Sequence, residues 1–228
     1  MSEPTPKSML EQISTCWPLI HNPLQFVMRY ARAIGKYVAA IVRDPHDAEE
    51  VAQDFLVRVF DQGFCPENVS RGRFRDYLKA AVRYVAISHL RRKRPAQLSE
   101  AEIESLAPPD AAADREWAEA WRACLLERVW QALELHQQKT TGNLFHTVLR
   151  QYSADPELTS ESHATQLSQR LGRPIRADAF RQTLSRARRQ FAELLVEEVR
   201  RTLQNPTADA LQQELIDLEL MPYVREFL

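Results

Sequence analysis

Glycine is scarce in this chain: only five are present among 228 residues. No Asn-Gly or Asp-Gly pair marks a tight hairpin, so strands joined by short turns are not indicated. The longer segments instead repeat their apolar residues at helical spacing. The composition and this periodicity together predict an all-α protein.

Long apolar runs are also missing. No stretch of about 18 apolar residues is present, so we expect no membrane span. The first residues lack a basic start followed by an apolar core, so no secretory signal is expected. The three cysteines, Cys16, Cys65 and Cys124, are odd in number and far apart. They indicate neither a disulfide framework nor a zinc site, and they suit a cytoplasmic protein.

Sequence motifs for catalysis are absent as well. The chain has no GxGxxG, Walker-type loop, HExxH or GxSxG, which are the common signatures of nucleotide, metal and nucleophile sites. Its six histidines do not fall into ligand spacing with the cysteines. We therefore expect no enzyme activity, no cofactor and no metal site. An enzyme whose site is assembled from surface carboxylates is the weakest alternative.

Charge is distributed unevenly although the net charge is only -1. Residues 71–95 carry nine Lys/Arg against one Asp, and residues 170–201 carry nine Arg against four acids. Acidic residues concentrate in 44–61 and 100–119. Two basic blocks on an otherwise neutral chain predict two nucleic-acid contacts.

Punctuation along the chain predicts two small helical domains joined by a flexible linker. Pro108-Pro109, an alanine run and several acids indicate the linker. The predicted divisions are an N-terminal extension (1–20), a first domain (21–95), the linker (96–114), a second domain (115–204) and a C-terminal helical extension (205–228).

Two capping pairs, Asn22-Pro23 and Asp44-Pro45, predict helix starts in the first domain. The face predicted to be buried in the first of these helices carries Leu24, Val27, Ala31, Ile34, Val38 and Ile41.

A helix-turn-helix is predicted around Gly172. One helix should end there with a residue of positive φ, and the next should run from about Ala177 to Gln204. In this motif the second helix enters the major groove of DNA. The candidates for reading bases are Arg181, Gln182, Ser185, Arg186 and Arg189, and those for phosphate are Arg173, Arg176 and Arg188. A solvated, ion-paired helix face is the alternative.

A long basic helix is predicted over 73–94, with Pro95 ending it. Its cations Arg75, Lys79 and Arg83 are four residues apart and therefore share one side. Aromatic rings beside cations suit stacking on unpaired bases. The DNA-binding candidates are Arg73, Arg75, Tyr77, Lys79, Arg83, Tyr84, His89, Arg91 and Arg92. Two plainer interpretations stay open: the terminal cations compensate the helix dipole, and His89 is an ordinary hydrogen-bonded helix residue.

An acidic face formed by Asp47, Glu50 and Asp54 lies beside Gln53 on the preceding helix. Such a face is common on surface helices, and early acids suit the helix dipole. Partner binding is the alternative interpretation of these residues.

Three segments of the chain resemble parts of a known protein family. The segments DAEEVAQDFLVRVF and RGRFRDYLKAAVRYVAISHLRRKRP are similar to domain two of extracytoplasmic-function (ECF) sigma factors of the sigma-70 superfamily. The segment QLSQRLGRPIRADAFRQTLSRARRQFAELL resembles their domain four. The resemblance covers about residues 20–95 and 120–203.

This resemblance implies a sigma factor whose partners are core RNA polymerase and promoter DNA, both duplex and melted. Polymerase would be bound through Asp47, Glu50, Gln53 and Asp54 beside Val51. Residues 67–94 would recognise and hold open the promoter element nearest the start site. The helix from Ala177 would read the upstream element, and the linker would thread along polymerase.

Some features depart from the family pattern, among them Asp178 in the upstream-reading helix and the tail after Gln204. The segment 207–228 either completes the core or awaits a partner such as an anti-sigma factor. Two other functions stay open. One is a helix-turn-helix regulator that binds duplex DNA without polymerase, and the other is a sigma-like interaction protein without promoter activity.

Overall fold

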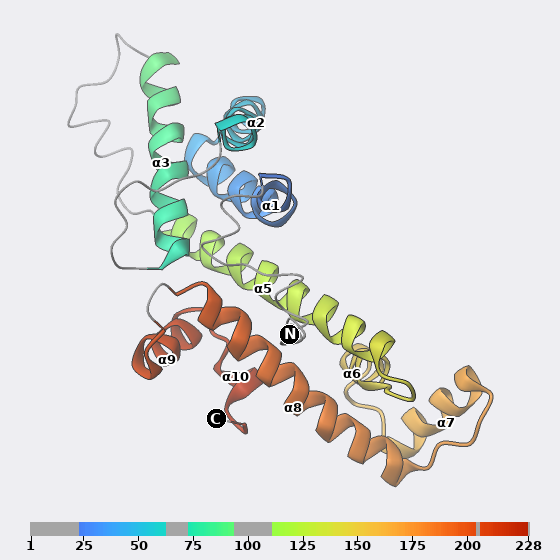
Figure 1. Cartoon of the computed structure of the whole chain (residues 1–228). Helices are drawn as coiled ribbons and strands as arrows, with labels where there is room; N and C mark the ends of the chain where they lie inside the picture. Colours follow the sequence, from blue (N-terminus) through green and yellow to red (C-terminus); the bar gives the residue numbers. More distant parts are fainter. Residues whose placement is uncertain (1–22, 63–72, 94–110, 204–205, 228) are drawn as a thin grey trace, which may run out of the picture. The chain divides into compact units, whose positions relative to one another are not determined.

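The computed structural model describes residues 23–62, 73–93, 111–203 and 206–227, and their regular structure is helical (Figure 1). This confirms the predicted all-α class. The helices are α1 (Pro23–Val42), α2 (Pro45–Gln62), α3 (Phe74–Lys93), α5 (Ala111–Lys139), α6 (Phe145–Ala154), α7 (Ser160–Leu171), α8 (Ala177–Arg201), α9 (Ala208–Asp217) and α10 (Met221–Val224). None of these helices is long and apolar enough to cross a bilayer.

The chain divides into two compact units. Unit 2 holds α1, α2, α3, the first part of α5 to Leu125, and the segment Val199–Glu219 with α9. Unit 1 holds the rest of α5, then α6, α7, α8 to Glu198, and α10. The start of α5 at Ala111 lies within the predicted linker. The N-terminal extension 1–20, linker residues 96–110 and loop 67–72 lie outside the described residues.

Unit 2 is built around α1, which packs against both α2 and α3. The ring of Tyr30 on α1 stacks on Trp121 of α5, with centroids 5.0 Å apart and planes 5° from parallel. Trp117, one turn earlier on α5, lies beside Tyr37, with ring centroids 5.2 Å apart. Because the two tryptophans are fully buried, the first part of α5 belongs to the core of this unit.

The buried face of α1 differs from the predicted one. Leu24 is 57% exposed, so the prediction was wrong for it, and Val27, Ala31 and Ile41 are only half-buried. Ile34 and Val38 are buried as predicted. The face that packs inward also carries Phe26, Tyr30, Ala33, Tyr37 and Val42. Counting aliphatic residues alone rotated the predicted stripe, because large aromatic side chains contribute much of the buried area.

Unit 1 is packed around the later part of α5 and the inward face of α8. Val129 and Leu133 on α5 are buried, as are Phe180, Leu184, Ala187, Phe191 and Leu195 on α8. The ring of Phe191 lies 5.0 Å from that of Trp130 on α5. In the same unit, His163 of α7 stacks on Phe180 of α8 at 5.1 Å with nearly parallel planes.

Candidate nucleic-acid interface

The acidic helix α2 begins at a capped end. Asp44 Oδ1 accepts a hydrogen bond of 2.9 Å from the backbone N–H of Asp47, as expected for an N-cap residue. Glu50, Gln53 and Asp54 are exposed, whereas Val51 is 2% exposed and packs inward. Glu50, Gln53 and Asp54, which were predicted to contact polymerase, therefore have side chains that a partner can reach. Val51 instead packs in the core beneath them.

The environment of Asp47 differs from that of the other predicted polymerase contacts, Glu50, Gln53 and Asp54. It is buried, and Lys93 at the end of α3 donates a hydrogen bond of 2.6 Å to its Oδ2. This hydrogen bond lowers the pKa of Asp47. His89 Nε2 lies 3.9 Å from the same carboxylate. Asp47 thus joins α2 to α3, and its predicted contact with polymerase stays a prediction.

The predicted DNA-contacting residues of α3 differ in their exposure to solvent. Tyr84 is 73% exposed, and Arg91 and Arg92 are exposed at the end of the helix. Tyr77, Lys79, Arg83 and His89 are half-buried. Lys79 Nζ lies 2.6 Å from Asp114 Oδ1 of α5. The open part of this predicted DNA surface is therefore its later half.

The start of α3 is hydrogen-bonded to the segment between α8 and α9. The N–H of Phe74 donates a hydrogen bond of 3.2 Å to the carbonyl of Thr202, and Arg73 forms an isolated antiparallel bridge with Leu203. The hydroxyl of Thr202 in turn donates to the carbonyl of Val199 at 2.7 Å. These contacts satisfy a backbone donor in the first turn of α3, which no intrahelical carbonyl can reach.

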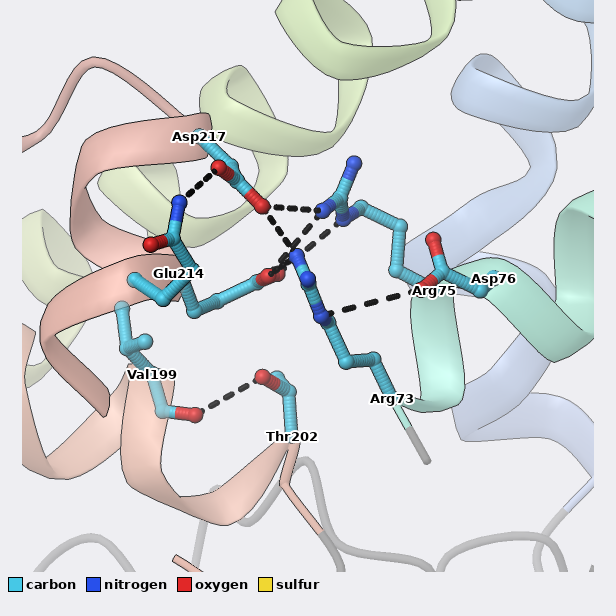
Figure 2. A network of polar contacts seen from close by, with 8 residues as sticks. Arg73, Arg75, Asp76, Val199, Thr202, Glu214 and Asp217 are labelled. Carbon is cyan, nitrogen blue, oxygen red and sulfur yellow. Dashed lines mark hydrogen bonds and ion pairs between the residues drawn. The ribbon is translucent and has the colours of Figure 1, made fainter. Parts of the chain in front are cut away.

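Two arginines at this point converge on two carboxylates of α9 (Figure 2). Glu214 is fully buried and accepts hydrogen bonds from Arg73 Nη1 at 2.7 Å and from Arg75 Nε and Nη2 at 3.0 Å each. Asp217 also pairs with Arg73, and Gln213 Nε2 donates to it at 2.7 Å. Arg75, with 9% exposure, is buried in this network.

The network favours the charged forms of Arg73 and Asp217. Burial opposes the charge of Arg73, but hydrogen bonds to Asp217 and Glu214 outweigh it and raise the pKa of the guanidinium. Burial likewise opposes the charge of Asp217, yet hydrogen bonds from Arg73 and Gln213 leave its pKa lowered. No local signal in the sequence singled out Glu214, Asp217 or Asp114 as partners of α3, because they are distant along the chain.

Helices α7 and α8 are joined by the short turn 172–176. Gly172 closes α7 with a positive φ of 65°, which confirms that prediction. Ser168 Oγ of α7 accepts a hydrogen bond of 2.8 Å from the N–H of Ile175 in the turn. The predicted DNA-contacting residues of this region are all exposed: Arg173, Arg176, Arg181, Gln182, Ser185, Arg186, Arg188 and Arg189.

Some of these exposed arginines have partners within the chain. Arg176 pairs with Asp178 at 3.1 Å, so this aspartate faces a cation. Arg181 Nη1 lies 3.6 Å from Glu161 of α7, and the guanidinium of Arg188 lies 4.6 Å from the ring centroid of Tyr152. Exposed pairs of this kind contribute little to stability, so they leave the arginines available for phosphate or bases.

The first three helices thus combine an acidic exposed helix with a basic one that bears an exposed aromatic ring. Residues 26–96, less than a third of the chain, match the family model of sigma-70 region 2. The match supports membership of the sigma-70 superfamily and a role in RNA polymerase binding and promoter melting. No curated protein and no solved structure matches the chain.

Proposed function

We propose that this chain is a sigma factor of the ECF type, which binds core RNA polymerase in the cytoplasm and directs it to promoters. The observation that carries the proposal is the region 2 match over residues 26–96. The chain supplies promoter recognition and strand opening, and polymerase performs the chemistry. This chain would therefore act by binding alone.

Polymerase is bound through the exposed acids of α2 in this proposal. Glu50 and Asp54 are exposed beside Gln53, and an anionic helix is complementary to a cationic partner surface. Asp47 is already engaged by Lys93. Glu50 and Asp54 are consequently better placed than Asp47 to form the contact.

The melted promoter strand is held by α3. The exposed ring of Tyr84 offers a face on which a base can stack, a contact that contributes about 1–3 kcal/mol per base. Arg91 and Arg92, also exposed on α3, supply charge for the phosphates. Tyr77 is half-buried, so Tyr84 has the larger free surface for stacking.

The upstream promoter element is read by α7 and α8 as a helix-turn-helix. The exposed residues in the first turns of α8 would reach base edges in the major groove. Arginine and glutamine are suited to guanine and adenine respectively, which favours Arg181 and Gln182 as readers. Arg173 and Arg176 precede or begin the helix and suit phosphate contacts, which position the protein without reading sequence.

The direct test is binding to purified core RNA polymerase, followed by transcription. We expect the full chain to co-purify with core polymerase and to start transcripts at defined positions on DNA of its source genome. Glu50→Lys should weaken polymerase binding about tenfold or more, because a like charge then faces a cationic surface.

Glu116→Lys is the matched control for this test, since it reverses an exposed acid on α5 of the same unit. Its binding to polymerase should equal that of the wild-type chain. A wild-type chain that ignores core polymerase at low salt would overturn the proposal. DNA binding without polymerase binding would instead indicate a helix-turn-helix regulator. Polymerase binding without transcripts would indicate a sigma-like interaction protein.

A further inference from the structure

We propose that Arg73 and Arg75 form an anion site for nucleic-acid phosphate, and that α9 keeps this site closed with Glu214 and Asp217. The inference rests on the proposed function, in which α3 contacts promoter DNA. It adds a regulatory role for the C-terminal extension. DNA and α9 compete for the same two guanidinium groups.

The chemistry of the site favours this competition. Arginine presents a planar fork of N–H donors that fits a carboxylate and a phosphate equally well. In the closed state the Nη1 of Arg73 and the Nε and Nη2 of Arg75 are all directed to Glu214. Asp217 takes a further contact from Arg73. Donors engaged in this way cannot bind a phosphodiester until the carboxylates leave.

Exposure indicates how the site can open. The side chain of Arg73 is 31% exposed and that of Asp217 is 30% exposed, whereas Glu214 is fully buried. The outer pair, Arg73 and Asp217, therefore borders solvent and is the point at which an incoming phosphate would first exchange with a carboxylate. The inner pair, Arg75 and Glu214, would exchange only when α9 moves away.

Helix α9 is suited to detach as one element. It has ten residues, too few for a stable isolated helix, so it depends on its contacts with the rest of unit 2. Those contacts include the apolar residues Leu211, Leu215 and Leu218, which are buried, besides the two carboxylates. Weakening one ion pair should therefore shift the balance toward DNA without abolishing the folded state.

The experiment measures the affinity of the full chain for a short, fluorescently labelled DNA single strand of mixed sequence, by anisotropy. We expect Asp217→Asn to bind this strand about threefold to tenfold more tightly than the wild-type chain. Asp217→Glu keeps the carboxylate and should bind with wild-type affinity. Asp209→Asn is the matched control, because it removes an equal charge from the exposed first turn of the same helix.

A double-mutant comparison separates competition from a general charge effect. In an Arg73→Ala background, Asp217→Asn should give no further gain in affinity. An equal gain from Asp209→Asn, or an unchanged gain in the Arg73→Ala background, would overturn the inference. If Asp217→Asn fails to fold, Gln213→Ala takes its place, since it removes only the hydrogen bond to Asp217. It should raise affinity in the same direction, and an unchanged affinity would count against the closed site.

Binding of the same proteins to core polymerase distinguishes a failure of the closed site from a failure of the proposed function. If every variant binds polymerase and initiates transcripts but Asp217→Asn resembles Asp209→Asn in DNA affinity, only the closed site is wrong. If neither the wild-type chain nor Asp217→Asn binds polymerase or DNA, the proposed function is overturned, and the site with it.

Discussion

Two glutamates that look like surface residues in the sequence are fully buried in the structure. Glu214 accepts hydrogen bonds from Arg73 and Arg75, and Glu198 accepts one of 2.8 Å from Arg128 Nε. A buried carboxylate is tolerated only with such partners, because losing water is costly for a charge. Each glutamate therefore depends on its arginine, and each arginine on its glutamate.

Replacing Glu214 by Ala should lower the free energy of unfolding by about 3–5 kcal/mol, since it leaves a buried guanidinium without its carboxylate. Urea titration followed by tryptophan fluorescence would measure the change, because Trp117 and Trp121 report on the core of unit 2. Asp209→Ala on the exposed side of α9 is the control and should change stability little. An equally small change for Glu214→Ala would mean that the network contributes no net stability.

At the scale of single elements, some helices expose predicted contact residues on their outer face, and others mainly contribute buried side chains to a core. Helix α8 is of the first kind along its early turns, where Arg181, Gln182 and Ser185 are exposed while Phe180 and Leu184 pack inward. The first part of α5 is of the second kind, with Trp117 and Trp121 buried. The same periodicity of 3.6 residues serves both purposes.

The double substitution Arg181→Ala and Gln182→Ala should relax upstream-sequence preference by about 1–3 kcal/mol for each base that these two side chains read. Binding of the holoenzyme to promoter variants would measure this, with core-polymerase affinity as the internal reference. Arg225→Ala, an exposed arginine of the same unit, should leave the preference unchanged. A collapse of polymerase binding in the double variant would show that α8 has been given the wrong role.

At the scale of the whole molecule, the net charge is only -1, but the cations of the two units differ in how they are paired with acids. In unit 2 one or more basic residues at each end of α3 pair with acids from other helices: Arg73 and Arg75 with α9, and Lys93 with α2. In unit 1 the first turns of α8 expose most of their arginines to solvent. Ion pairs therefore join helices in unit 2, whereas the arginines at the start of α8 in unit 1 stay largely exposed even where they have partners.

The stability of unit 2 should depend on pH through Asp217. Its pKa in the folded chain is lowered from 3.8, so the charged carboxyl stabilises the fold above the pKa of the unfolded chain. That contribution disappears as the pH falls through the lower, folded value. The difference in unfolding free energy between wild type and Asp217→Asn should be greatest near neutral pH and shrink below about pH 5.

Urea titrations of the two proteins at several pH values would measure that difference. Asp209→Asn, compared with wild type in the same way, should show little dependence on pH. A wild-type advantage over Asp217→Asn that grows as the pH falls would contradict the lowered pKa of Asp217.

Much of the candidate site could be predicted from the sequence because its signals are local. The positive φ of Gly172, the inward stripe of α8 and the exposed acids Glu50 and Asp54 all follow from spacing within one or two turns. The pairing of Arg75 could not be predicted in this way. Its position four residues before Lys79 indicated a shared side of α3, but nothing in that spacing shows whether the side meets solvent or another helix.

By itself the sequence determined that the chain is helical, where α2 begins and α7 ends, and which region of α3 is cationic, since caps, propensity and periodicity act between near neighbours. Only the tertiary structure decided which charges meet. Arg75 and Glu214 are separated by 139 positions, and their contact exists because folding brings α9 to the start of α3. The strength of that contact depends on burial, a property that residue spacing along the chain does not carry.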